Sequence, residues 1–238
     1  MMPKLILTML VANLVCLTGT ADTYKVIPTE SVFAVVTHKA GLAAALAHDH
    51  FVYPGTYTAE LSTDPAHPDQ PHFKLEFATA ALVNDDSAAK AKWYPYVKAA
   101  GILDTPFKNV CEKDRQTIHE HMLAENQLDA ERYLKISAEL KAVREQQSTH
   151  GEKNYAYEAT VAFTVHGKTV ERPFAANIDP KGDTVHFEAV GSFNFTDFGV
   201  TPFSAFLGTV RNQDTFHVYV NATAQRDSTG DAAKSPAP

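Results

Sequence analysis

The chain has 238 residues and a formal net charge of −7, and 45% of its residues are hydrophobic. This length fits one large β domain or two small ones, with enough apolar side chains for a core. Because Lys and Arg form no basic patch and acidic residues predominate, the composition disfavours binding to nucleic acid or a general affinity for anionic membranes.

The start of the chain has the pattern of a secretory signal peptide. Lys4 provides a positive start, residues 5–17 form an almost unbroken apolar run, and Gly19 and Ala21 are small residues at the −3 and −1 positions of a cleavage site. We therefore expect residues 1–21 to be removed and the mature protein to be periplasmic or secreted. Because the run is too short to span a bilayer comfortably, no stable transmembrane span is expected after cleavage; an uncleaved anchor is the minority alternative.

Neither cysteine is predicted to have a functional role. Cys16 ends the apolar run, but Val15 stands where a lipoprotein signal has a small Gly or Ala, so lipid attachment is disfavoured. After cleavage Cys111 is the single cysteine and cannot form an intrachain disulfide. We interpret it as a small buried hydrophobe rather than a redox or nucleophilic thiol.

The segment around His48 and His50 is the most distinctive candidate site. A strand is predicted over residues 48–61, with a bulge or bend at Pro54. Side chains at i and i+2 share one face of a strand, so both imidazoles would project together and Asp49 would point the other way. Three interpretations stay open: head-group recognition at a pocket mouth, a metal site, or histidines with only structural roles. A metal would need further ligands in a compact cluster. The other histidine candidates are His38, His119, His121 and His166.

Residues 85–126 interrupt the strand pattern and are predicted to form a helical insertion. Asp85 or Asp86 can cap a first helix that ends before Pro95. A second helix is predicted over residues 112–126, with a moderate apolar stripe. We expect the insertion to pack on or over one end of a sheet.

Alternating apolar residues predict strands through most of the remaining chain, the first within residues 24–37 and the last within 216–222. About eight strands in hairpin-like succession favour a mainly β fold, an antiparallel barrel or sandwich, over a parallel sheet. An eight-stranded barrel can be just wide enough to hold a small or thin ligand. A filled core would show the same alternation. The small residues that leave room on the inward lines are Ala159, Ala176, Ala189 and Gly191.

Three later segments carry weak motifs in a fixed order. Residues 114–133 lead from a helix into a strand, residues 165–170 contain a His-Gly turn, and residues 195–200 have the sequence F-T-D-F-G-V. These segments resemble the D-x-x-x-Y/F-P strand start, the L-T-x-H-G turn and the R-x-D-F-G-I segment of the YceI-like proteins. The resemblance extends over residues 24–224.

The chain departs from the commoner pattern of that family in three places. It has the segment from His48 to His50, it has a longer helical insertion, and Leu134 stands where the family often has Pro. It is more similar to a subgroup that carries a G/A-H-x-H segment after the first strand.

The resemblance implies an antiparallel eight-stranded lipocalin-like barrel over residues 22–226. Residues 227–238 are polar and rich in Pro and Ala, and this composition predicts a disordered tail. The resemblance also implies a periplasmic carrier of an amphipathic isoprenoid lipid or a quinone, with no other cofactor expected and a homodimer left open. The alternative is a metal-binding protein or metal-dependent enzyme that uses His48 and His50. The candidate ligand-binding residues are His48, His50, Phe163, His166, Phe174, Phe187, Phe193 and Phe195.

Overall fold

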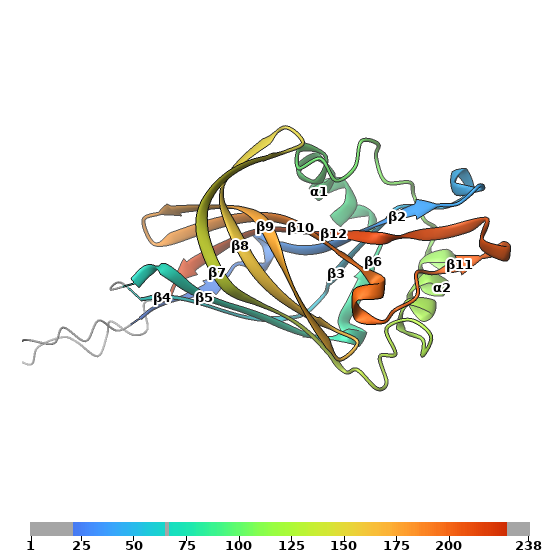
Figure 1. Cartoon of the computed structure of the whole chain (residues 1–238), viewed down its shortest axis with the longest axis horizontal. Coiled ribbons are helices and arrows are strands. Elements are labelled where there is room, and N and C mark those ends of the chain that lie inside the picture. The colour runs from blue at the N-terminus through green and yellow to red at the C-terminus, as the bar shows by residue number, and fades with distance from the viewer. Residues whose placement is uncertain (1–20, 65–66, 228–238) are drawn as a thin grey trace, which may run out of the picture.

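A computed structural model describes residues 21–64 and 67–227 of the chain (Figure 1). The predicted signal peptide and the predicted disordered tail therefore lie almost entirely outside the described residues. The described strands pair in one twelve-stranded sheet. No helix within the described ranges is long and apolar enough to cross a membrane.

Eight strands of this sheet close into a ring. The last of them, β12, bonds back to the first, β1, through pairs such as Tyr24 with Arg226. This closure confirms the predicted mainly β fold with an antiparallel eight-stranded barrel. In order, the ring consists of β1 (Asp22–Val26), β4 (Thr58–Asp64), β5 (His67–Ala78), β7 (Lys135–His150), β8 (Lys153–Val165), β9 (Lys168–Lys181), β10 (Thr184–Asn194) and β12 (Val210–Arg226).

Four further strands extend the sheet beyond the ring. The first part of β12 pairs with β2, which pairs with β3, which in turn pairs with β6. The short β11 pairs with the start of β12. These strands are β2 (Val32–Ala40), β3 (His50–Pro54), β6 (Leu82–Asn84) and β11 (Ser204–Ala205).

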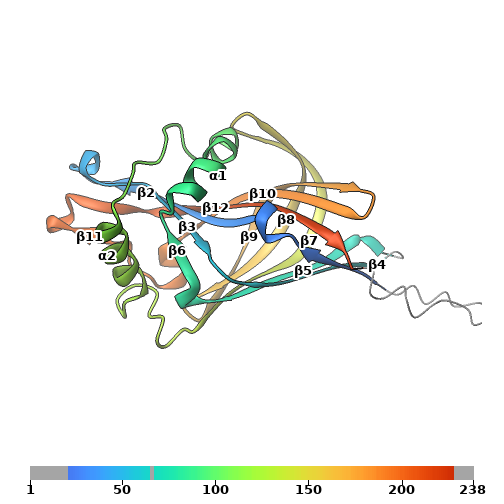
Figure 2. The same cartoon turned by 180° about the vertical axis from the view of Figure 1, so that it is seen from behind.

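Two helices cover different parts of the barrel. Helix α1 (Ser87–Ala99) lies on the outer face of the sheet, where Trp93 and Val97 share a buried cluster with Val36 and Tyr219. Helix α2 (Glu112–Leu123) lies beside β11 at one end, as both views show (Figures 1 and 2).

The turn between β7 and β8 contacts the end of α1 through two glycines. A Cβ on Gly101 would lie 2.7 Å from the backbone nitrogen of Gly151, so this contact requires the absence of a side chain. Both residues also have positive φ, which favours glycine.

Two predicted strands are wrong in extent. Residues 24–37 form two strands, because Pro28 cannot donate a ladder hydrogen bond and begins the 3₁₀ turn η1 (Pro28–Glu30). The strand predicted over residues 48–61 is also divided, since Pro54 ends β3 and the chain turns before β4. His48 precedes β3 and belongs to no strand.

The first helix was predicted to end before Pro95, which is wrong, because α1 continues to Ala99. Pro95 removes one hydrogen bond to the carbonyl four residues earlier. Trp93 and Val97 are buried on either side of it, so packing on the sheet holds the helix together through the proline. The second helix confirms its predicted start and ends at Leu123, three residues earlier than predicted.

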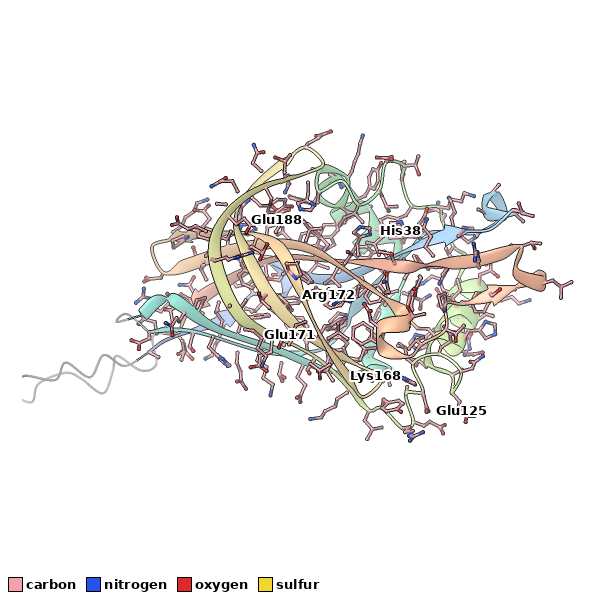
Figure 3. The ribbon with its side chains drawn as sticks, viewed as in Figure 1. His38, Glu125, Lys168, Glu171, Arg172 and Glu188 are labelled. Atoms are coloured by element: carbon pink, nitrogen blue, oxygen red, sulfur yellow. The ribbon has the colours of Figure 1, made fainter. Side chains whose placement is uncertain are left out.

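Two histidines lie close together on β2 and β12. His38 (Figure 3) is joined to His217 by a hydrogen bond of 2.8 Å between Nε2 and Nδ1. Burial, then the neighbouring His38 and His150, lower the pKa of His217 from 6.5 to about 4. Burial also lowers the pKa of His38, which Asp49 partly offsets. The pair is therefore neutral at pH 7.

The lowered pKa of His217 predicts a loss of stability in mild acid. Below pH 6.5 the unfolded chain binds a proton that the folded protein binds only near pH 4, so the stability is complete above pH 6.5 and falls between these values. Between pH 7.5 and pH 5 the free energy of unfolding should fall by about 2 kcal/mol through this group. Urea denaturation of the His217→Gln variant should show that much less pH dependence. The control is the same substitution at the half-exposed His72, and an unchanged pH dependence in His217→Gln would contradict the prediction.

Candidate functional site

The barrel interior contains two adjoining cavities with apolar walls. The larger has a volume of about 380 Å³ and the smaller about 180 Å³. Volumes of a few hundred Å³ are typical of small-molecule sites. The two cavities are adjacent, because several residues line both. The residues that line both are Val35, Val52, Phe77, Leu82 and Phe163.

The five predicted phenylalanines all line this interior. Phe195 lines the smaller cavity and Phe163 lines both. Phe198, which the strand pattern did not single out, joins them in an aromatic cluster, with its ring centroid 5.5 Å from that of Phe193. The three that line only the larger cavity are Phe174, Phe187 and Phe193.

The predicted small residues act in two ways. Ala159, Ala176 and Ala189 line the larger cavity and leave space there, as predicted. Gly191 does not, because the ring of Phe174 lies over it, 2.5 Å from the position that a Cβ would occupy. At Gly191 the ring fills the space that the missing side chain leaves.

His50 lines the smaller cavity, and a hydrogen bond to Asp85 fixes the orientation of its ring. It begins β3, and its Nδ1 lies 2.7 Å from Oδ2 of Asp85, at the end of β6. Asp85 is fully buried, and its other oxygen accepts a hydrogen bond from the backbone N–H of Phe51. A carboxylate that accepts from Nδ1 fixes the tautomer of the ring and leaves Nε2 as the nitrogen available to a ligand.

Asp85 is held ionised although it is buried. Burial by itself raises the pKa of the carboxyl group, but the hydrogen bond and charge of His50, the N–H of Phe51 and the charge of Lys90 together hold that pKa below its usual value. The Lys90 ammonium is itself buried, 3.7 Å from Asp85 Oδ1, and donates to the carbonyl of Lys108. Positive charge thus neutralises the carboxylate on the side away from the cavity.

Thr37 supplies a second polar group in the same cavity. It lies directly opposite His50 in the β2–β3 register, and both residues line the smaller cavity. Its side-chain oxygen is buried and has no hydrogen-bond partner among the described residues. A buried hydroxyl without a partner is costly, so this one is a candidate contact for a ligand oxygen.

His48 and His50 do not project together as predicted. The two ring centroids are 6.3 Å apart, and His48 lines neither of the two cavities. Burial, then the charge of His50, lower the pKa of His48. Asp49 points elsewhere, since its carboxylate accepts from the backbone N–H of Lys39 and pairs with the Lys39 ammonium. This carboxylate holds the turn that places His48 outside the strand.

His166 also lies outside both cavities. Its Nδ1 is 3.3 Å from the carbonyl of Phe198, and its ring packs on Tyr133. It therefore connects the β8–β9 turn to the 3₁₀ helix η4 (Phe195–Phe198). Among the described residues, no group of three or more His, Cys, Asp or Glu side chains could hold a metal ion, so the metal alternative lacks a supporting cluster.

Helix α2 forms one wall of the smaller cavity through Ile118, His121 and Met122. It is attached to β6 by Arg115, whose Nε donates to the carbonyl of Asn84 while the amide of Asn84 donates back. No residue of α2 is fully buried. The expectation that Cys111 is buried is wrong, because it precedes α2 at the N-cap position and is exposed.

A closed antiparallel barrel around apolar cavities defines a lipocalin-like barrel fold. The YceI-like domain family matches residues 24–224, and the chain belongs to this family. Its barrel fold is known for binding hydrophobic ligands.

Solved structures resemble this fold at low sequence identity. Burkholderia cenocepacia BcnA is 15% identical with a TM-score of 0.55, and the match covers 84% of this chain and 100% of that one. The Campylobacter jejuni YCEI protein is 14% identical with a TM-score of 0.41, and 71% and 83% of the two chains are covered. No curated protein matches the chain significantly.

Because Asp85 is buried and Asp86 caps a helix, we expect the same substitution at the two positions to change the free energy of unfolding by very different amounts. Asp85→Asn keeps the shape of the side chain but leaves the Lys90 ammonium without its counter-ion, and should lower the free energy of unfolding by about 3 kcal/mol. Asp86 accepts from the N–H of Ala89 as the cap of α1. Asn caps helices equally well, so Asp86→Asn should change stability by less than about 0.5 kcal/mol. Urea denaturation measures both, and equal effects would contradict the assigned role of Asp85.

Proposed function

We propose that the protein is a periplasmic carrier that binds an amphipathic isoprenoid-type lipid or quinone inside its barrel. The observation that carries the proposal is an apolar interior with polar side chains at one end, among them His50 and Thr37. A ligand of matching chemistry has an apolar chain and an oxygen-bearing head group. The family and the predicted signal peptide support the ligand class and the compartment.

The hydrogen-bonding capacity of His50 and Thr37 narrows the head group. Nδ1 of His50 is hydrogen-bonded to Asp85, so Nε2 is the ring nitrogen left for a ligand, while the Thr37 hydroxyl can donate or accept. A ligand hydroxyl both donates and accepts, so it can satisfy the two together. The head group we propose is therefore a hydroxyl, as in a prenol or a reduced quinone, with the chain extending past Phe163 into the larger cavity.

Extraction of the purified protein tests the proposal most directly. Protein from the periplasmic fraction is extracted with organic solvent, and the extract is analysed by mass spectrometry. We expect an isoprenoid alcohol or quinone in stoichiometric amount. A lipid-free protein that also fails to bind prenols added in solution would contradict the proposal.

The larger cavity predicts that added bulk displaces the ligand. Ala176→Trp or Ala189→Trp should fill the cavity and reduce binding of a long-chain prenol at least about tenfold. The fold should be kept, because the new side chain enters existing space. The control is Glu171→Trp, at an exposed position of the same strand β9 (Figure 3). A loss of roughly 1–3 kcal/mol in stability with unchanged prenol binding would instead indicate a filled core.

Thr37 predicts opposite effects on stability and binding. Thr37→Val keeps the shape but removes the unpartnered hydroxyl, so the ligand-free protein should gain about 1 kcal/mol of stability. Affinity for a prenol should fall about fivefold, while affinity for the corresponding hydrocarbon should stay the same. Fluorescence displacement and thermal melting measure the two effects.

Thr79→Val is the matched control for this experiment. Thr79 is also buried, but its hydroxyl donates to the carbonyl of Tyr133. Its replacement should lower stability and leave the preference for prenol over hydrocarbon unchanged. A loss of that preference in both variants, or in neither, would contradict the role given to Thr37.

A further inference from the structure

Two chain segments project from one end of the barrel and carry its most exposed apolar side chains. The first tip is residues 41–47, which include the 3₁₀ helix η2 (Ala44–Leu46), and the second tip is residues 204–209. Both lie at the end opposite the terminal strand β1, as the two views show (Figures 1 and 2). Leu42 in the first tip is 99% exposed and Leu207 in the second is 106% exposed.

The two tips form one surface. The backbone N–H of Ala43 donates to the carbonyl of Thr209 at 2.8 Å, and Ala40 pairs with Arg211 just below. Gly41 approaches the same carbonyl so closely that no side chain fits there. The exposed leucines are thus presented together by paired backbones.

Both tips begin and end at the smaller cavity. The first lies between Thr37 and His50, which line it. The second lies between Phe203 and Asn212, which also line it and are joined by a backbone hydrogen bond of 2.9 Å. Whatever the tips contact is therefore brought next to this end of the barrel.

The backbone of Leu207 has a conformation that is unfavourable for a leucine. Its φ of 55° lies in the left-handed region, which disfavours a large side chain and favours Gly or Asn. A fully exposed leucine in this conformation contributes nothing to the core. Only a contact outside the chain can bury this side chain.

The charges around the tips differ from those of the whole chain. The net charge of −7 disfavours a general attraction to anionic surfaces. However, the three segments that meet at this end, residues 38–48, 105–111 and 199–213, contain no Asp or Glu. The Lys108 ammonium donates to the carbonyl of Ala45 in the first tip. Arg211 is exposed and lies two residues after the end of the second tip. Neither has a carboxylate partner among the described residues.

We propose that the two tips are a membrane-contact surface of the protein. Leu42 and Leu207 enter the interfacial region of a phospholipid bilayer, and Lys108 and Arg211 face anionic head groups. The contact places the smaller cavity next to the bilayer. That this position serves lipid uptake or delivery rests on the proposed function, whereas the contact itself does not.

A bilayer suits these features better than a second copy of the chain. Two leucines on narrow tips offer little area for a stable dimer, which buries about 800 Å² from each partner. Leucine side chains flanked by basic residues are the combination that binds membrane interfaces. Self-association is therefore treated as an outcome that the experiment can detect.

Vesicle flotation of the full chain tests the proposal. Wild-type protein should float with vesicles of phosphatidylethanolamine and phosphatidylglycerol, and more weakly with phosphatidylcholine alone. The Leu42→Asn/Leu207→Asn variant should bind at least about tenfold more weakly, because each leucine contributes through burial of its side chain. Asn is suited to the left-handed conformation at position 207, so its melting temperature should not fall. The control is Leu134→Asn, which changes a leucine that is 65% exposed outside the tips.

A tryptophan at position 42 tests the depth of the contact. Fluorescence of Leu42→Trp should be quenched by vesicles with brominated acyl chains, whereas Leu134→Trp should not be. The native Trp93 is buried between α1 and the sheet and gives a constant background.

Each outcome decides the proposal. Absence of wild-type flotation, or equal flotation of the double variant, would overturn the membrane contact. The proposal would also be overturned if sedimentation showed that the wild type is a dimer and the double variant a monomer, since the tips would then join two copies. Prenol binding in solution is measured in parallel: if it persists without vesicle binding, the membrane contact fails while the carrier function stands.

Discussion

A single buried carboxylate connects the sheet, the outer helix and the interior of the barrel. Asp85 binds the backbone of β3 through Phe51, orients His50 and neutralises Lys90 of α1. Together these contacts compensate the cost of burying the carboxylate. The position at which β3 extends from the ring, and the direction in which His50 points, therefore depend on one ionised side chain.

The barrel combines a well-packed outer face with an interior that is only partly filled. Outside, Trp93 and Val97 of α1 pack in one cluster with Tyr219 of the sheet and stabilise the fold independently of any ligand. Inside, Ala159, Ala176 and Ala189 leave apolar space in the larger cavity. This division allows the interior to give up packing for binding while the outer cluster maintains the fold.

The fold was largely predictable because alternation of apolar side chains is a local property. A period of two identifies each strand without knowledge of its partner, and hairpin-like succession then implies an antiparallel barrel or sandwich. The interior phenylalanines follow from the same lines. Strand ends were less predictable, since Pro28 and Pro54 divide strands whose side-chain pattern continues through them.

The site was predictable only in part, because its geometry depends on contacts between distant residues. His50 stood out by its spacing from His48, yet its partner Asp85 lies 35 residues away and resembled a helix cap. Asp86 performs the capping, which frees Asp85 to turn inward through a left-handed backbone. In the sequence nothing distinguishes Thr37 from other threonines in strands. Its place in the site follows only from the β2–β3 register, which sets it opposite His50.

Closure of the ring by its first and last strands has a consequence for how the chain folds. Arg226 of β12 bonds to Asp22 of β1, which is 204 residues earlier, and the neighbouring backbone pairs join the same two ends. Contacts of such sequence separation carry a large loop-closure entropy and form slowly. Until β12 has been synthesised the ring cannot close, and its apolar lining stays open to water and to other chains. The nascent protein therefore passes through a stage in which its apolar strands are exposed and prone to aggregation.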